Sequence, residues 1–169
     1  MSGRIGRGAG IALALAIGTA VAAGGALAHD TKGEKATTPG ARAALMRHDN
    51  FEKLGANFKR LNDELRKGSP DKAVLTQTAT AVKTYSGQLP TWFPRGSGQE
   101  ARPKSEAKAN IWTDAAGFTA ASSNLQVQAS KLQQAATAGD IDALKAQVRA
   151  TGGACKACHD KYRVEKKDS

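Results

Sequence analysis

The sequence predicts an all-α fold, arranged as an antiparallel four-helix bundle. Apolar residues recur at intervals of three and four along four long stretches, which is the spacing of one helix face. Two links between these stretches are short and one is long, a pattern that suits a bundle of antiparallel neighbours. No stretch shows the alternation that is typical of a strand. The main structural alternative is a three-helix arrangement in which the second helix is frayed.

Residues 1–28 are predicted to be a secretory signal peptide rather than part of this bundle. Arg4 and Arg7 form a positive start, an apolar stretch follows, and Ala26-Leu27-Ala28 is a small-x-small cleavage site. An uncleaved membrane anchor is less favoured, because the apolar stretch is short for a span and rich in Ala and Gly. Export with a leader of this kind indicates a bacterial periplasm. No other apolar run suggests a transmembrane segment once the leader is removed.

The mature chain is predicted to be basic and to hold one modest core. Removal of 28 residues from 169 leaves 141, and the loss of two arginines lowers the formal charge from +10 to +8. The basic residues are spread along the chain, which favours a surface that meets acidic proteins or anionic lipid over a nucleic-acid site. Residues 29–40 are polar and rich in turn formers, and are predicted to be a disordered mature N-terminus. Residues 166–169 form a polar tail.

Residues 41–67 and about 70–88 are predicted to be the first two helices. The apolar face of the first carries Phe51, Leu54, Phe58, Leu61 and Leu65. Between the helices, Gly68 suits a left-handed helix end, Ser69 an N-cap and Pro70 the first helical position. The inner face of the second helix carries Leu75, Thr78, Val82, Tyr85 and Leu89.

Residues 90–104 are predicted to be a long loop, because prolines and glycines interrupt the helical spacing there. Its two aromatic residues, Trp92 and Phe93, are expected to fill a gap in the core. The third helix is predicted over residues 104–138. Its large apolar residues are seven apart, as in knobs-into-holes packing: Ile111, Phe118, Leu125 and Leu132.

The fourth helix is predicted to begin near Asp140, and it carries the motif Cys155-Lys156-Ala157-Cys158-His159. The spacing C-x-x-C-H is the attachment signature of a c-type haem: each thiol forms a thioether with a haem vinyl group, and the imidazole becomes an axial iron ligand. The apolar rhythm of the helix runs through both cysteines: Ile141, Leu144, Val148, Thr151, Cys155, Cys158 and Tyr162. One covalent haem c is therefore predicted on the inner wall of the bundle. Gly152 and Gly153 leave room beside the backbone there.

Three other interpretations of the two cysteines suit the sequence less well. A zinc site needs about four ligands, and the remaining histidines, His29 and His48, are distant in sequence. A thioredoxin-type dithiol belongs at a strand-to-helix junction, which this pattern lacks. A simple disulfide leaves the adjacent His159 unexplained.

Five runs of the sequence carry a family resemblance. They are Cys155 to Arg163 (CKACHDKYR), Arg47 to Phe51 (RHDNF), Leu89 to Pro94 (LPTWFP), Glu100 to Pro103 (EARP) and Ile111 to Ala116 (IWTDAA). Together they resemble the cytochromes c′, which are class II c-type cytochromes. The resemblance covers about residues 40–165, so residues 41–165 are expected to form one cytochrome c′-like bundle. It also implies a homodimer.

The resemblance implies roles for single residues. Phe51 matches the position over the iron, which is apolar in high-spin members and a methionine ligand in low-spin members, so this chain resembles the pentacoordinate kind. Arg47 matches an arginine near a haem propionate. Glu100 matches a position where the loop approaches the haem edge. Arg163 matches an arginine on the open proximal side, where it could hydrogen-bond a ligand or shield the imidazole. His48 departs from the usual glutamine, and could bond a propionate or bind the iron.

These features predict a periplasmic haem protein with pentacoordinate, high-spin iron that binds small diatomic ligands (NO and CO), transfers electrons, or does both. It is not expected to be an enzyme. The alternative is a six-coordinate, low-spin electron carrier that uses Met46 or His48 as a ligand. A peroxidase or NO reductase would need a distal acid-base group, which His48 alone could supply. No nucleic-acid partner is expected, and the redox partner is not identified.

Overall fold

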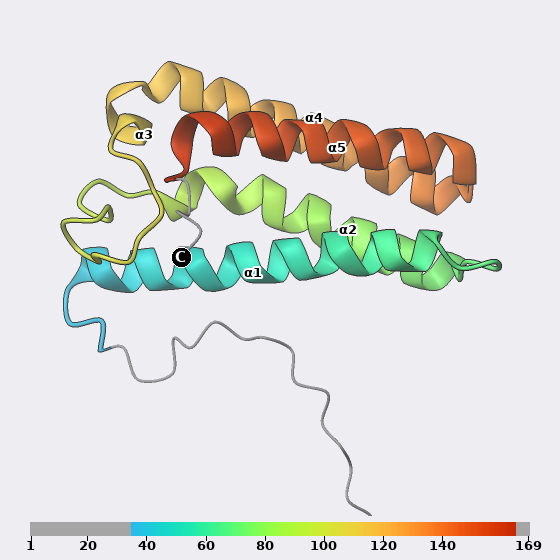
Figure 1. Ribbon diagram of the computed structural model, residues 1–169, viewed down its shortest axis with the longest axis horizontal. Helices are drawn as coiled ribbons and strands as arrows, with labels where there is room; N and C mark the ends of the chain where they lie inside the picture. Colours follow the sequence, from blue (N-terminus) through green and yellow to red (C-terminus); the bar gives the residue numbers. More distant parts are fainter. Residues whose placement is uncertain (1–34, 165–169) are drawn as a thin grey trace, which may run out of the picture. The chain divides into compact units, whose positions relative to one another are not determined.

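A computed structural model of the chain describes residues 35–164. Its four long helices are α1 (Pro39–Leu65), α2 (Lys72–Gln88), α4 (Ala115–Ala138) and α5 (Ile141–Tyr162). They run alternately up and down, so the predicted all-α antiparallel four-helix bundle is confirmed (Figure 1). The predicted signal peptide and polar tail lie outside the described residues.

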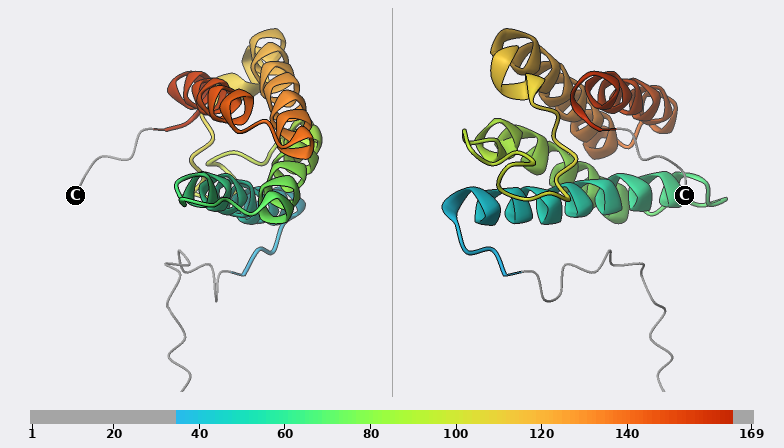
Figure 2. Two further views of the ribbon diagram at one scale, coloured as in Figure 1. Left: turned by 90° about the vertical axis from the view of Figure 1, so that its right-hand side faces the viewer. Right: turned by 60° about the vertical axis from the view of Figure 1, so that its left-hand side comes forward.

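The four helices form two layers. The pair α1 and α2 makes one layer and the pair α4 and α5 makes the other (Figure 2). Close packing of α2 against α4 joins the layers on one side, whereas α1 and α5 touch only sparsely on the other. We call this second contact line the α1–α5 seam.

The helix starts differ from the sequence expectation in two places. Helix α1 begins at Pro39, before residue 41, because the Thr38 hydroxyl accepts a hydrogen bond from the amide of Ala41 at 3.1 Å. Helix α2 begins at Lys72 rather than at Pro70. Its N-cap is Asp71 and not Ser69, because the Asp71 carboxylate accepts the amide of Ala73 at 2.7 Å.

The helix ends at Gly68 and Gly139 differ from each other in backbone conformation. Gly68 does not adopt the left-handed conformation that was expected, and within the described residues the positive-φ glycines are Gly96 and Gly139. Gly139, with a φ of 81°, ends α4, and Asp140 caps α5 by accepting the amide of Ala143 at 2.9 Å. The short link between the last two helices is therefore as predicted.

The predicted third helix is wrong at its start. Residues 104–109 are not helical, a short helix α3 (Asn110–Thr113) follows, and Asp114 separates it from α4. The Asp114 carboxylate caps α4 by accepting the amide of Gly117 at 3.1 Å. The predicted apolar row is buried throughout despite this break, at Ile111, Phe118, Leu125 and Leu132.

The core consists of two clusters along the bundle. One lies toward the short links and includes Leu61, Leu75, Leu132 and Leu144. The other includes Leu89 and Trp92 of the 3₁₀ turn η1 (Leu89–Trp92), together with Ile111, Phe118 and Tyr162. Trp92 is buried and so fills the core as expected from its loop position. None of the helices in residues 35–164 has the length and apolarity that a membrane span requires.

Candidate haem site

The cysteines of the C-x-x-C-H motif lie on the side of α5 that faces the core. Thr151, Ala154 and Tyr162 of the same helix are buried, and both Cys155 and Cys158 are half-buried against the second core cluster. The three-and-four spacing of the helix places these residues on one face. The structure thus confirms the prediction that both thiols lie on the core-facing side of this helix.

The environment of the thiols does not suit a redox dithiol. Burial, together with the nearby Cys158, raises the pKa of the Cys155 thiol to about 11, and burial also raises the pKa of Cys158. Reactive dithiols instead have lowered thiol pKa values, because a helix start or a cation stabilises the thiolate. Both thiols are therefore expected to be neutral at pH 7 and to pack like small apolar side chains.

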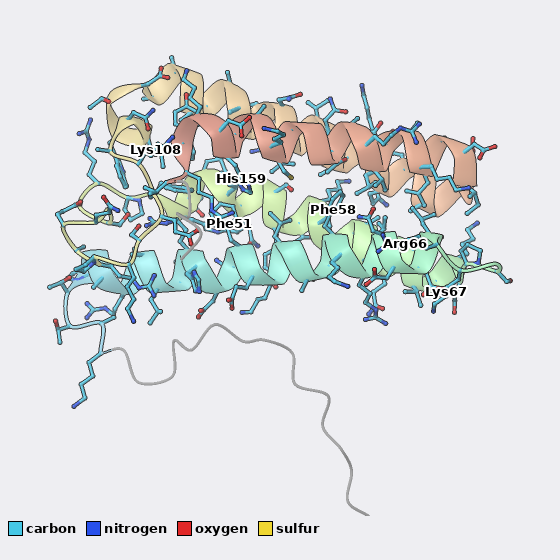
Figure 3. The ribbon with its side chains drawn as sticks, in the orientation of Figure 1. Phe51, Phe58, Arg66, Lys67, Lys108 and His159 are labelled. Carbon is cyan, nitrogen blue, oxygen red and sulfur yellow. The ribbon has the colours of Figure 1, made fainter. Side chains whose placement is uncertain are left out.

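His159 follows the second cysteine on α5 and is exposed. It lies on the side of α5 that faces α1 (Figure 3). The pKa of His159 is lowered, first because the neighbouring protein partly desolvates the imidazole and next because of the charge of Arg163. A lowered pKa favours the neutral imidazole, which is the form that binds metal ions.

Phe51 lies on the side of α1 that faces α5 (Figure 3), and it is fixed by aromatic contacts. Its ring meets Trp92 edge to face with centroids 5.1 Å apart, and Phe93 with centroids 6.1 Å apart. The half-buried ring packs against both core clusters. Sequence periodicity alone placed Phe51 on the inner stripe, but not against these two loop residues.

The α1–α5 seam narrows at Gly152. A Cβ atom built at Gly152 would lie 3.9 Å from Cζ of Phe58, whereas one at Gly153 would meet nothing within 4 Å. Gly152 thus lies beside the Phe58 ring, with room for a Cβ in ordinary van der Waals contact. Beyond this contact, toward Cys155 and Phe51, the seam is lined by the groups that the sequence assigns to the haem.

Arg47 is buried at 4% exposure and is held by the loop that follows α2. Its Nη1 donates to the Trp92 carbonyl at 3.2 Å and to Ser97 Oγ at 2.9 Å, and its Nη2 donates to the Ser97 carbonyl at 2.7 Å and to Ser105 Oγ at 2.9 Å. Burial, followed by the charge of Arg102, lowers the pKa of Arg47 to about 10, so it stays charged at neutral pH. Both terminal nitrogens thus already donate to loop oxygens. The expected contact of Arg47 with a haem propionate stays a prediction.

His48 follows Arg47 on α1, and Glu100 belongs to the loop that Arg47 holds. Nε2 of His48 is buried and lies 3.3 Å from Glu52 Oε1, but it forms no hydrogen bond within residues 35–164. The Glu100 carboxylate turns back on its own loop and accepts the amide of Gly98 at 3.0 Å. A haem-edge role for either residue stays a prediction.

The end of α5 is anchored by contacts to two distant acidic residues, Asp114 and Glu106. The Tyr162 hydroxyl donates to the Asp114 carboxylate at 2.8 Å, and Lys161 Nζ lies 2.7 Å from the same oxygen. Arg163 Nε donates to Glu106 Oε2 at 2.6 Å. These partners are about fifty residues apart in the chain, so no local pattern could have paired them.

The described residues fit a covalent haem on three counts. Two inward thiols and the adjacent imidazole lie on the helix that borders a seam where α1 and α5 touch sparsely, Gly152 has no side chain beside that seam, and the ring of Phe51 lies on the side of α1 that faces α5 (Figure 3). No group of three or more His, Cys, Asp or Glu side chains in residues 35–164 is placed to hold a metal ion without such a cofactor.

Comparisons with known proteins agree with this site. A family model described as Cytochrome C' matches residues 42–163. The cytochrome c′ of Rubrivivax gelatinosus is 36% identical over 118 residues, which are 69% of this chain and 90% of that protein. The cytochrome c′ of Alcaligenes xylosoxydans xylosoxydans is 35% identical over 125 residues, which are 73% of this chain and 94% of that protein.

Two similar solved structures are variants of cytochrome c prime from Alcaligenes xylosoxidans. A ferrous arginine-to-lysine variant with bound NO is 30% identical, has a TM-score of 0.68, and covers 75% of this chain and 97% of its own. A leucine-to-glycine variant with bound carbon monoxide is 31% identical, has a TM-score of 0.67, and covers the same shares.

Proposed function

Because the chain belongs to the cytochrome c′ family, we propose that it is a periplasmic haem protein with pentacoordinate, high-spin iron that is open to NO and CO. The family consists of haem proteins that transfer electrons or bind ligands, and it is not a class of enzymes. Its members carry covalent haem c, and we propose that Cys155 and Cys158 hold it in this chain. Solved relatives are described with bound NO and with bound carbon monoxide, which supports a diatomic ligand here.

Phe51 carries the proposal of an open coordination position. It lies on the side of α1 that faces His159 on α5, and a phenyl ring has no donor atom for iron (Figure 3). Its edge-to-face contacts with Trp92 and Phe93 hold it in that place. A bound haem supplies an iron that binds diatomic gases when one axial position is free. We propose that Phe51 keeps larger molecules from that position and yields to small, neutral ligands.

The other motif residues have separate roles in this proposal. Cys155 and Cys158 would fix the porphyrin to α5, His159 would bind the iron as a neutral imidazole, and Phe51 would cover the coordination position that stays open. Arg47 secures the loop of residues 92–105 beside the haem edge, where it and Glu100 are proposed to meet the propionates. Arg163 is proposed to lie near the proximal side of the iron.

The low-spin alternative requires a protein ligand in place of the open position. Met46 is 51% exposed on α1, so it points away from the core in which Phe51 packs. The buried and unbonded Nε2 of His48 is the one observation that favours the alternative. A peroxidase or NO-reductase activity would also depend on His48, and we do not propose one.

The location and the partners are also proposals. The leader in residues 1–28 supports export to a periplasm, and the family supports a homodimer. The formal charge of +8 expected for the mature chain, which is +10 less the two leader arginines, supports an acidic redox partner protein rather than a nucleic acid.

The absorption spectrum of the reduced protein tests the proposal. We expect a high-spin spectrum as isolated and a low-spin spectrum after addition of CO or NO. His48→Ala and Met46→Ala are matched controls, and neither is expected to change the spectrum as isolated. Sharp low-spin bands without added ligand, lost in either alanine variant, would show a protein ligand and overturn the proposal.

A further inference from the structure

The segment before α3 pairs with the end of α5. Ala107 and Arg163 form an isolated antiparallel β-bridge. The amide of Lys108 donates to the Tyr162 carbonyl at 3.0 Å, and the amide of Val164 donates to the Glu106 carbonyl at 2.8 Å. These two backbone bonds fix which side chains of the segment meet the residues that follow His159.

This register brings Glu106 against Arg163. Oε2 of Glu106 accepts from Nε of Arg163 at 2.6 Å and lies 2.5 Å from its Nη2. The two side chains are 35% and 41% exposed, respectively, so the pair is partly shielded from water. The amide of Arg163 also donates to the His159 carbonyl at 2.9 Å, which ties Arg163 to the last turn of α5.

We propose that Glu106 is a positioning residue for the proximal side of the haem, where its carboxylate fixes the guanidinium of Arg163 and offsets its charge beside His159. The inference rests on the proposed function, in which His159 is the axial ligand. The backbone bond from the Arg163 amide to the His159 carbonyl places the pair one helical turn beyond that ligand.

The Glu106–Arg163 ion pair is expected to orient the guanidinium of Arg163 more than it stabilises the fold. A partly exposed ion pair contributes little to the free energy of unfolding. A guanidinium held through two nitrogens by one carboxylate, however, loses most of its freedom to turn. The backbone bonds of the segment hold the carboxylate in place, so Arg163 has one preferred position. Loss of Glu106 would let the guanidinium move toward or away from the iron ligand.

A double-mutant cycle on the haem-loaded protein tests this inference. The variants are Glu106→Gln, Arg163→Gln and the double variant, with reduction potential and the rate of NO release from the ferrous protein as readouts. Asp63→Asn is the matched control, because it removes one carboxylate from an ion pair with Lys59. Asp63 is three residues before Arg66, which lies at the end of α1 far from His159 (Figure 3).

We expect Glu106→Gln to raise the reduction potential and to change the NO release rate about threefold or more, with the change largely absent in the Arg163→Gln background. Asp63→Asn should leave both readouts as in the wild type. Strictly additive effects in both readouts would mean that Glu106 does not act through Arg163, and would overturn the inference.

Two further measurements keep the test decisive. Far-UV circular dichroism shows whether each variant folds. If Glu106→Gln does not fold, Glu106→Asp replaces it, because it keeps the charge but shortens the side chain that reaches Arg163. If the protein proves low-spin and does not bind NO, the proposed function fails, but the potential cycle still reports the coupling between Glu106 and Arg163. If the shifts in reduction potential of the two single variants then add up to that of the double variant, the inference is overturned independently of the proposed function.

Discussion

Gly152 on α5 and Phe58 on α1 mark the point where the α1–α5 seam closes. A Cβ at Gly152 would make an ordinary van der Waals contact with the ring, at 3.9 Å from Cζ and 4.0 Å from Cε1. A larger side chain would have to push α1 away from α5. Gly152 and Phe58 therefore lie face to face on the two helices that are proposed to enclose the haem.

We expect Gly152→Ala to be tolerated and to stabilise the protein by about 0.5–1 kcal/mol, because alanine is the better helix former. Gly152→Leu is expected to lower both the free energy of unfolding and the haem content, because its extra carbons meet Phe58. Urea unfolding and the haem-to-protein absorbance ratio measure the two effects. Gly153→Ala is the matched control, since a Cβ there meets nothing within 4 Å. A Gly152→Leu protein with normal stability and haem content would show that the seam is wider than described.

Phe51→Ala is expected to raise the affinity for CO about tenfold or more. A ligand must displace the wild-type ring from two aromatic neighbours, and such contacts contribute about 0.5–1.5 kcal/mol each. CO titration of the reduced protein measures the change. Phe58→Ala removes a ring from the same stripe of α1, and should lower the stability without changing the CO affinity. Equal affinities in the wild type and Phe51→Ala would contradict the assignment of Phe51 to the iron.

Arg47→Gln is expected to destabilise the protein by about 3 kcal/mol, because a buried cation with four hydrogen bonds is replaced and its loop acceptors lose their donors. Urea unfolding followed by circular dichroism measures this loss. Arg42→Gln is the control, because Arg42 is an exposed arginine of the same helix. Equal losses in the two variants would show that the bonds to Ser97 and Ser105 contribute little.

Asp114 makes the stability of the protein depend on pH in the acid range. Its hydrogen bonds to Lys161 and then Tyr162 lower the pKa of its carboxyl from 3.8 to about 2. The folded state therefore binds the proton more weakly than the unfolded state. The stabilisation from Asp114 is complete above about pH 4 and is lost as the pH falls toward 2.

Asp114→Asn should consequently be less stable than the wild type near neutral pH, and should lose less additional stability between pH 4 and pH 2. Thermal unfolding at a series of pH values measures both. Tyr162→Phe removes one of the two side-chain donors and is expected to show a smaller change of the same sign. Parallel acid profiles for the wild type and Asp114→Asn would exclude this role.

Cys155→Ser and Cys158→Ser are each expected to keep one thioether, and the double variant none. The pyridine haemochrome spectrum distinguishes one from two reduced vinyl groups. Acid–acetone extraction then separates covalent haem from free haem. Full haem retention by the double variant after extraction would contradict the assigned attachment sites.

The sequence predicted those parts of the fold that depend on local periodicity. The row Ile111, Phe118, Leu125 and Leu132 correctly gave a buried helix face, and the rhythm through Cys155 and Cys158 correctly gave their inward register. The break at Asp114 was missed, because a capping aspartate does not interrupt an apolar row that continues in phase on either side.

The environment of the site was less accessible to prediction. Arg47 binds Ser97 and Ser105, which are 50 and 58 residues away, and Glu106 binds Arg163 across 57 residues. Such pairings depend on how the long loop folds back, and polar loop residues have no periodicity that reveals it. Residues 104–109 were assigned to a helix for the same reason, since their pairing with the end of α5 is not visible in the local sequence.

The position of the thiols in the last long helix has a consequence for biosynthesis. Helices α1, α2 and α4 precede α5 in the chain, and α2 packs on both α1 and α4. During export to the proposed periplasm these three helices would arrive first and can pack together before Cys155, Cys158 and His159 follow. Maturation of the cofactor is then a closing step, in which α5 reaches a partner surface that already exists.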